Sequence, residues 1–90
     1  MIINYSSKFT NQYKELIKTN KKLTLKVDKK IGFFINNPYH PSLRTHKVST
    51  TKAGVAFSFW GEGDLRIIFT WIGKNEALLL LIGNHKEVYK

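Results

Sequence analysis

The 90-residue chain has room for one domain with a small hydrophobic core, and we expect residues 1–90 to form it. Its 15 Lys and Arg residues against 6 Asp and Glu residues give a formal charge of +9, which favours nucleic acid, an anionic membrane or an acidic protein as ligand over a merely solubilising surface. The chain contains no cysteine, which excludes disulfides and thiolate metal sites and fits the reducing cytoplasm. Its longest apolar run, residues 77–82, is far below the roughly 20 residues that span a bilayer, and the N-terminal residues lack a signal-peptide segment, so we expect a soluble protein without a membrane partner.

The first half of the chain predicts a short strand followed by two helices. Apolar side chains at positions 2, 3 and 5 indicate the strand. Ser7 is the expected N-cap of a first helix that ends near Asn20, and its apolar face consists of Phe9, Tyr13, Leu16 and Ile17. A second helix is expected over residues 23–35, with an apolar face of Val27, Ile31, Phe34 and Ile35. Pro38 prevents it from continuing.

The second half predicts strands joined by short turns. Residues 39–42 form a loop beside two prolines, in which His40 is a loop or capping residue. Strands are expected over residues 43–49, 55–59, 65–71 and 77–82, with glycine-containing turns at 61–63 and 73–75. The predicted fold class is therefore α+β, with an N-terminal strand and two helices packed on one face of an antiparallel sheet.

Alternation along these strands predicts which side chains share the open face. If Leu65, Ile67, Phe69 and Trp71 face the helices, Arg66 faces the other side, because successive side chains of a strand point to opposite faces. Trp60 and Ser58 belong to the same side on the preceding strand, and Arg44, His46 and Val48 on the strand before it. A register slip of one residue would invert the assignment.

Three segments of the chain resemble one family. The element Pro38-Tyr39-His40-Pro41-Ser42-Leu43, the strand start Asp64-Leu65-Arg66-Ile67-Ile68-Phe69 and the ending Ile82-Gly83-Asn84-His85-Lys86-Glu87-Val88-Tyr89 resemble the RelE/ParE superfamily of bacterial toxins, most of all its YafQ branch. The resemblance covers nearly the whole chain. It implies a toxin that cuts messenger RNA in the ribosomal A site without metal or other cofactor, and that a cognate antitoxin neutralises.

The resemblance also implies a set of site residues. Its catalytic positions correspond to His46, Asp64, Arg66, His85 and Tyr89. The chain departs from some YafQ-like enzymes, which have a further histidine where this sequence has Phe59-Trp60. It also ends one residue after Tyr89 in the sequence given, which leaves little to support that aromatic ring.

RNA cleavage without a metal needs a base for the ribose 2′-OH, an acid for the departing 5′-oxygen and cations for the phosphoryl oxygens. Histidine suits the first two tasks because its ordinary pKa is about 6.5. We expect His85 to be the leading acid or base and His46 its partner, with Arg66 as a bidentate phosphate ligand. Asp64 orients a histidine or serves as a secondary base, and Tyr89 stacks on a base or relays a proton.

Each of these residues has a simpler interpretation. His85 and His46 are also ordinary exposed residues, Asp64 also serves the glycine turn, Arg66 also suits a pair with Glu62, and Tyr89 also suits C-terminal packing. Trp60 is structural or stacks on a base. Zinc binding by His40, His46 and His85 lacks any local ligand spacing, so we expect no metal.

The lysines are the remaining candidates for substrate binding. One set lies on the second helix and either forms a solvated face or contacts the phosphates of ribosomal RNA: Lys22, Lys26, Lys29 and Lys30. Lys47 and Lys52 are expected nearer the active face. Two alternatives to the ribonuclease stay open: a ParE-like toxin that inhibits DNA gyrase by protein contact, for which the two histidines are unnecessary, and an inert RNA-binding module, for which charge alone suffices.

Overall fold

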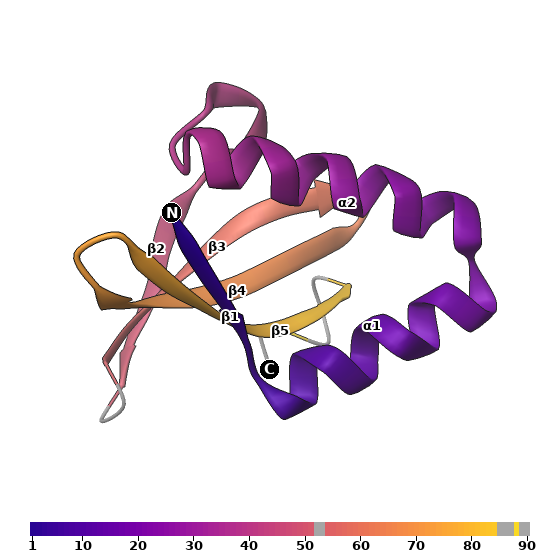
Figure 1. The fold of residues 1–90 in the computed structure, drawn as a ribbon, viewed down its shortest axis with the longest axis horizontal. Helices are drawn as coiled ribbons and strands as arrows, with labels where there is room; N and C mark the ends of the chain where they lie inside the picture. Colours follow the sequence, from indigo (N-terminus) through magenta and orange to yellow (C-terminus); the bar gives the residue numbers. More distant parts are fainter. Residues whose placement is uncertain (52–53, 85–87, 89–90) are drawn as a thin grey trace.

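The fold is a single five-stranded sheet that two helices cover on one side (Figure 1). A computed structural model describes residues 1–51, 54–84 and 88. Its elements are β1 (Ile2–Tyr5), α1 (Ser7–Thr19), α2 (Lys21–Asn36), a 3-10 turn η1 (Pro41–Leu43), β2 (His46–Thr51), β3 (Gly54–Glu62), β4 (Leu65–Gly73) and β5 (Glu76–Asn84). The predicted α+β class, with both helices on one face, is confirmed.

The strand order is β1-β5-β4-β3-β2, and the sheet is mixed. Strands β2 to β5 form the expected antiparallel meander. The first strand instead runs parallel to the last, with Ile3 opposite Ala77 and Tyr5 opposite Leu79. Parallel neighbours require a long connection between them, and here the whole chain between β1 and β5 supplies it.

Two polar caps set the ends of the helices. Ser6, not the predicted Ser7, is the N-cap of α1, because its Oγ accepts a hydrogen bond of 3.0 Å from the Phe9 N–H. Asn20 alone separates the helices: its N–H donates to the Leu16 carbonyl, and its Oδ1 accepts from the Leu23 N–H. Among the described residues, no helix combines the length and apolar composition that a membrane span requires.

The core lies between the helices and the inner face of the sheet, and Phe34 is at its centre. The Phe34 ring stacks on Phe59 at 4.4 Å between centroids and meets Phe69 edge-on at 4.7 Å. All three side chains are fully buried, as strand alternation predicts for Phe59 and Phe69 and helical spacing for Phe34. Two predicted core positions are wrong: Ile17 and Ile35 are exposed, because each lies at the margin of its helix's apolar stripe.

A hydrogen bond between Tyr13 and Asp28 joins α1 to α2 and gives a testable pH dependence. Burial, and then this bond, raise the pKa of Tyr13 from 10.0 to about 12. Since the unfolded chain loses this proton near pH 10 and the folded chain near pH 12, the stabilisation is complete below pH 10 and is lost as the pH rises to 12. We expect the free energy of unfolding, measured with urea, to fall less steeply over this range in Tyr13→Phe. Identical slopes in variant and wild type would contradict the assignment.

Candidate active site

The face of the sheet that the helices leave open carries His46, Trp60 and Arg66. His46 lies opposite Ser58, and Trp60 lies opposite Arg66. Cross-strand partners share a face, and so do residues two apart on one strand, which confirms the predicted face of these three side chains. From strand spacings of about 4.8 Å and a rise of about 3.3 Å per residue, the Cα atoms of His46 and Arg66 lie about 12 Å apart.

His46 begins β2, and its ring is held in one orientation. Its Nδ1 lies 2.8 Å from the Arg44 carbonyl oxygen. Because a carbonyl only accepts hydrogen bonds, Nδ1 carries the proton. In the neutral ring Nε2 then keeps its lone pair, and the side chain is exposed. His46 therefore presents a free basic nitrogen to a ligand on the open face.

Arg66 is half-buried, and two backbone carbonyls fix its guanidinium. Nη1 donates to the Leu65 carbonyl at 3.1 Å and to the Gly63 carbonyl at 3.4 Å. The alternative pairing with Glu62 is not found in the part of the chain that the structure describes. Both contacts use one nitrogen of a group with five N–H donors, so donors remain for a phosphate.

Two other predicted site residues, Asp64 and Lys47, lie away from His46, and their roles in the site stay predictions. Asp64 is exposed in the turn between β3 and β4, roughly 10 Å further along the strands than the row of His46. The Nδ1 partner of His46 is the Arg44 carbonyl. Lys47 lies opposite Phe57, whose side chain packs toward the helix-side core, so Lys47 is on the other face of the sheet from His46.

Trp60 is held by its indole and lies next to cations. Its Nε1 donates to the Gly63 carbonyl at 2.8 Å. The Nζ of Lys30 lies 4.5 Å from the centre of a Trp60 ring, and the guanidinium carbon of Arg44 lies 5.6 Å from it. The tryptophan therefore links α2 and the segment before β2 to the open face.

The predicted lysine stripe is present on α2. Lys22, Lys26 and Lys29 are exposed on the side of the helix away from the buried Val27, Ile31 and Phe34, and Lys30 lies half-exposed at the margin of this stripe. Like charges four residues apart repel one another. The one carboxylate of this helix, Asp28, bonds to Tyr13 on α1. A polyanion would relieve this repulsion, which favours the stripe as a binding surface.

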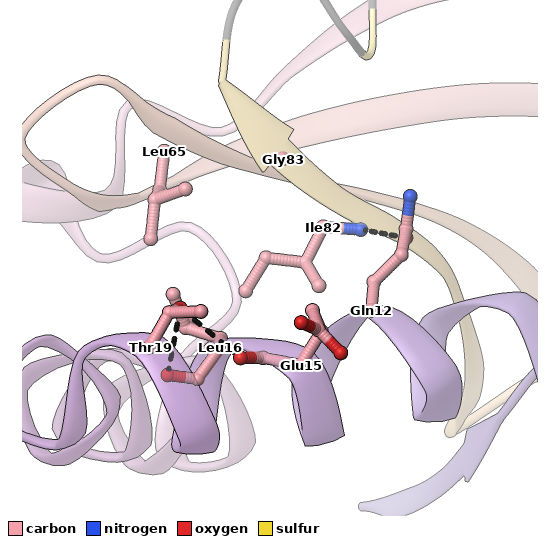
Figure 2. A pocket seen from close by; sticks show the side chains of 7 residues that line it. All are labelled: Gln12, Glu15, Leu16, Thr19, Leu65, Ile82 and Gly83. Carbon is pink, nitrogen blue, oxygen red and sulfur yellow. Dashed lines mark hydrogen bonds between the residues drawn. The ribbon is translucent and has the colours of Figure 1, made fainter.

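A cavity of about 220 Å³ lies on the helix side, beside the end of β5 (Figure 2). It is lined by Gln12, Glu15, Leu16, Thr19, Leu65, Ile82 and Gly83. The Gln12 Oε1 accepts a hydrogen bond of 2.8 Å from the Ile82 N–H, so α1 holds the strand that runs beside Arg66. Nothing in the sequence indicated this role of Gln12, because it depends on a contact between residues 70 positions apart.

Three predicted site residues, Lys52, His85 and Tyr89, lie outside the described residues. The described part of β5 ends at Asn84, opposite Leu65, with Gly83 opposite Arg66. The last described residues of this strand therefore lie next to the row that carries Arg66. The roles of the three residues stay predictions.

Solved structures of bacterial toxins match nearly the whole chain. A YoeB/ParE toxin from Agrobacterium tumefaciens matches with a TM-score of 0.78 and 12% identity, over 94% of this chain and 99% of its own. YafQ from E. coli strain BL21(DE3) matches with a TM-score of 0.75 and 18% identity, over 98% and 97%. A metal-bound toxin from Helicobacter pylori matches with a TM-score of 0.76 and 25% identity, over 98% of each chain. The chain has the RelE/ParE toxin fold.

The RelE/ParE fold confirms the resemblance seen in the three sequence segments. Neither a protein-family model nor a curated protein sequence matches the chain, so the likeness lies in the structure. The Helicobacter toxin of this fold is metal-bound. In the chain described here, residues 1–51, 54–84 and 88 contain no group of three or more His, Cys, Asp or Glu side chains placed to hold a metal ion.

Proposed function

We propose that the protein is the toxin of a toxin–antitoxin pair and cleaves messenger RNA at the ribosomal A site by acid–base catalysis. The observation that carries this proposal is the pairing of His46, with Nε2 free as a base, and the fixed cation Arg66 on one open face of a RelE/ParE fold. An inert RNA-binding module would need a cation such as Arg66, but it would not need a histidine such as His46 held in one tautomer.

The cleavage that we propose involves two proton transfers. A base takes the proton of a ribose 2′-OH, and the 2′-oxygen attacks the neighbouring phosphorus to form a 2′,3′-cyclic phosphate. The bond to the 5′-oxygen breaks, and an acid protonates that oxygen to give a 5′-hydroxyl end. We assign His46 and His85 to these transfers and Arg66 to the charge on the phosphoryl oxygens. Their distribution between base and acid stays open.

Two partners belong to this proposal. Structurally similar YoeB of Staphylococcus aureus is found in a toxin–antitoxin complex with YefM, which supports a cognate antitoxin for this chain. The ribosome is the second partner. The lysine stripe of α2 is suited to ribosomal RNA, because each phosphate contact releases counterions and strengthens binding at low salt.

Induced expression in a bacterial host should arrest growth by stopping translation. Primer extension on a reporter message is expected to show new 5′ ends within translated codons, and co-expression of the antitoxin should remove them. An intact message together with accumulated gyrase–DNA breaks would contradict the proposal and would assign the protein to the ParE-like, gyrase-directed class.

A further inference from the structure

A corner of the molecule beside His46 gathers cations around one tryptophan. Lys30 from α2 and Arg44 from the segment before β2 both lie over Trp60 of β3, at 4.5 and 5.6 Å from the ring centre. We call these three residues the Trp60 corner. Phe33 extends it, with the Nζ atoms of Lys29 and Lys30 at 5.8 and 5.6 Å from its ring centre. Aromatic rings order cations above them without neutralising their charge.

Arg44 has a backbone conformation that its residue type does not favour. It is the one residue other than glycine with positive φ in the described part of the chain, with φ 52° and ψ 39°. Glycine or asparagine adopts this left-handed conformation more easily. The carbonyl that fixes His46 Nδ1 is available from any residue, so the backbone role does not account for an arginine here. An arginine at this position indicates that its guanidinium has a binding role.

We propose that the Trp60 corner binds a phosphate of the RNA strand next to the phosphate cleaved at His46 and Arg66; this subsite rests on the proposed function. Lys30 and Arg44 contact the phosphate oxygens, and Trp60 is a positioning residue that holds both cations. The two cations near the ring favour this positioning role over stacking on a base. A guanidinium over a ring keeps its N–H donors at its edge, where they suit phosphate.

The test is the salt dependence of RNA binding. The probe is a short, fluorescently labelled single-stranded RNA with 2′-O-methyl riboses, which resists cleavage by 2′-OH attack, and its anisotropy gives Kd over a series of KCl concentrations. Binding to single strands loses about 0.7 in the slope of log K against log salt for each phosphate contact removed. We expect this loss in the double variant Lys30→Met, Arg44→Gly. Glycine keeps the left-handed backbone, and Arg44→Asn provides a second variant that tolerates it.

The matched control removes the same number of charges elsewhere. Lys8→Met, Lys14→Met on α1, which runs along the lower edge of the view in Figure 1 while α2 runs along the upper edge, should leave the slope unchanged. Trp60→Leu should lower the slope as well, because the cations lose their support. A weaker affinity with an unchanged slope in Trp60→Leu would instead indicate base stacking and would overturn the positioning role.

The remaining outcomes separate the subsite from the ribonuclease proposal. A wild-type slope in the Lys30, Arg44 double variant, or weakened binding only to the antitoxin, would overturn the phosphate subsite while leaving messenger RNA cleavage untouched. The expected loss of slope in a protein that never cleaves message would instead contradict the ribonuclease and leave an RNA-binding corner. No measurable binding by the wild type at low salt would overturn the subsite.

Discussion

Replacing His46 with alanine should slow RNA cleavage about 10²–10⁴-fold, the usual contribution of a group that transfers a proton in the transition state. The affinity for RNA should change little, because a proton-transfer group contributes mainly to the rate of the chemical step. Folding should also be retained, since His46 is exposed at the start of an edge strand and its removal leaves no buried cavity. Single-turnover cleavage of a programmed message, with binding measured separately, gives both quantities.

His40 provides the matched control for this experiment. Its Nδ1 accepts a hydrogen bond from the Ser42 N–H, and its ring stacks on Phe33, which confirms the predicted capping role. His40→Asn keeps an acceptor for that cap and should cleave at the wild-type rate. We expect His85→Ala to be at least as damaging as His46→Ala. Wild-type rates in both folded variants would refute the histidine mechanism.

The second large effect is expected for Arg66. Arg66→Ala should lower the cleavage rate about 10²–10³-fold, as for the loss of one preorganised donor to a developing anion. It should weaken RNA binding as well, because the guanidinium contacts phosphate before and during the reaction. Arg66→Lys keeps the positive charge but loses the planar guanidinium that the two carbonyls hold. Compared with Arg66→Ala, it should therefore recover RNA binding more than it recovers the cleavage rate.

The separation of rate and affinity decides the role of Arg66. Single-turnover rates at saturating ribosome concentration report the chemical step, and their dependence on concentration reports binding. A variant Arg66→Ala with weaker binding but the wild-type saturating rate would show that Arg66 holds the substrate without stabilising the transition state.

Local pattern predicted most of the fold, because each element carries its own periodicity. The alternation of Ile67 and Phe69 placed their side chains in the core and Arg66 on the open face, as observed. The parallel pairing of β1 with β5 was not predictable from either strand, since it depends on which edge the finished meander leaves free. A bulge between Lys47 and Ser49 likewise removes Val48 from the expected row of open-face residues.

The site was predicted in part. His46 and Arg66 were correctly assigned to one face, because that assignment needs only the period of two and the register. The tautomer of His46 was not predictable, as it depends on the left-handed turn at Arg44. The position of Lys30 over Trp60 depends on how α2 packs across β3, which the sequence of neither element specifies.

The chemistry of the cut ends tests the central claim most directly. Ribosomes carrying a defined message are incubated with the purified wild-type protein and EDTA, which removes transition metals. Magnesium is kept in excess over EDTA so that the ribosome stays intact. The ends of the RNA fragments are then mapped by enzymatic labelling. Attack by the 2′-OH leaves a 2′,3′-cyclic or 3′-phosphate on one fragment and a 5′-hydroxyl on the other, and we expect these ends at A-site codons. Fragments with 5′-phosphate ends, formed by attack of water, would contradict acid–base catalysis by the histidines.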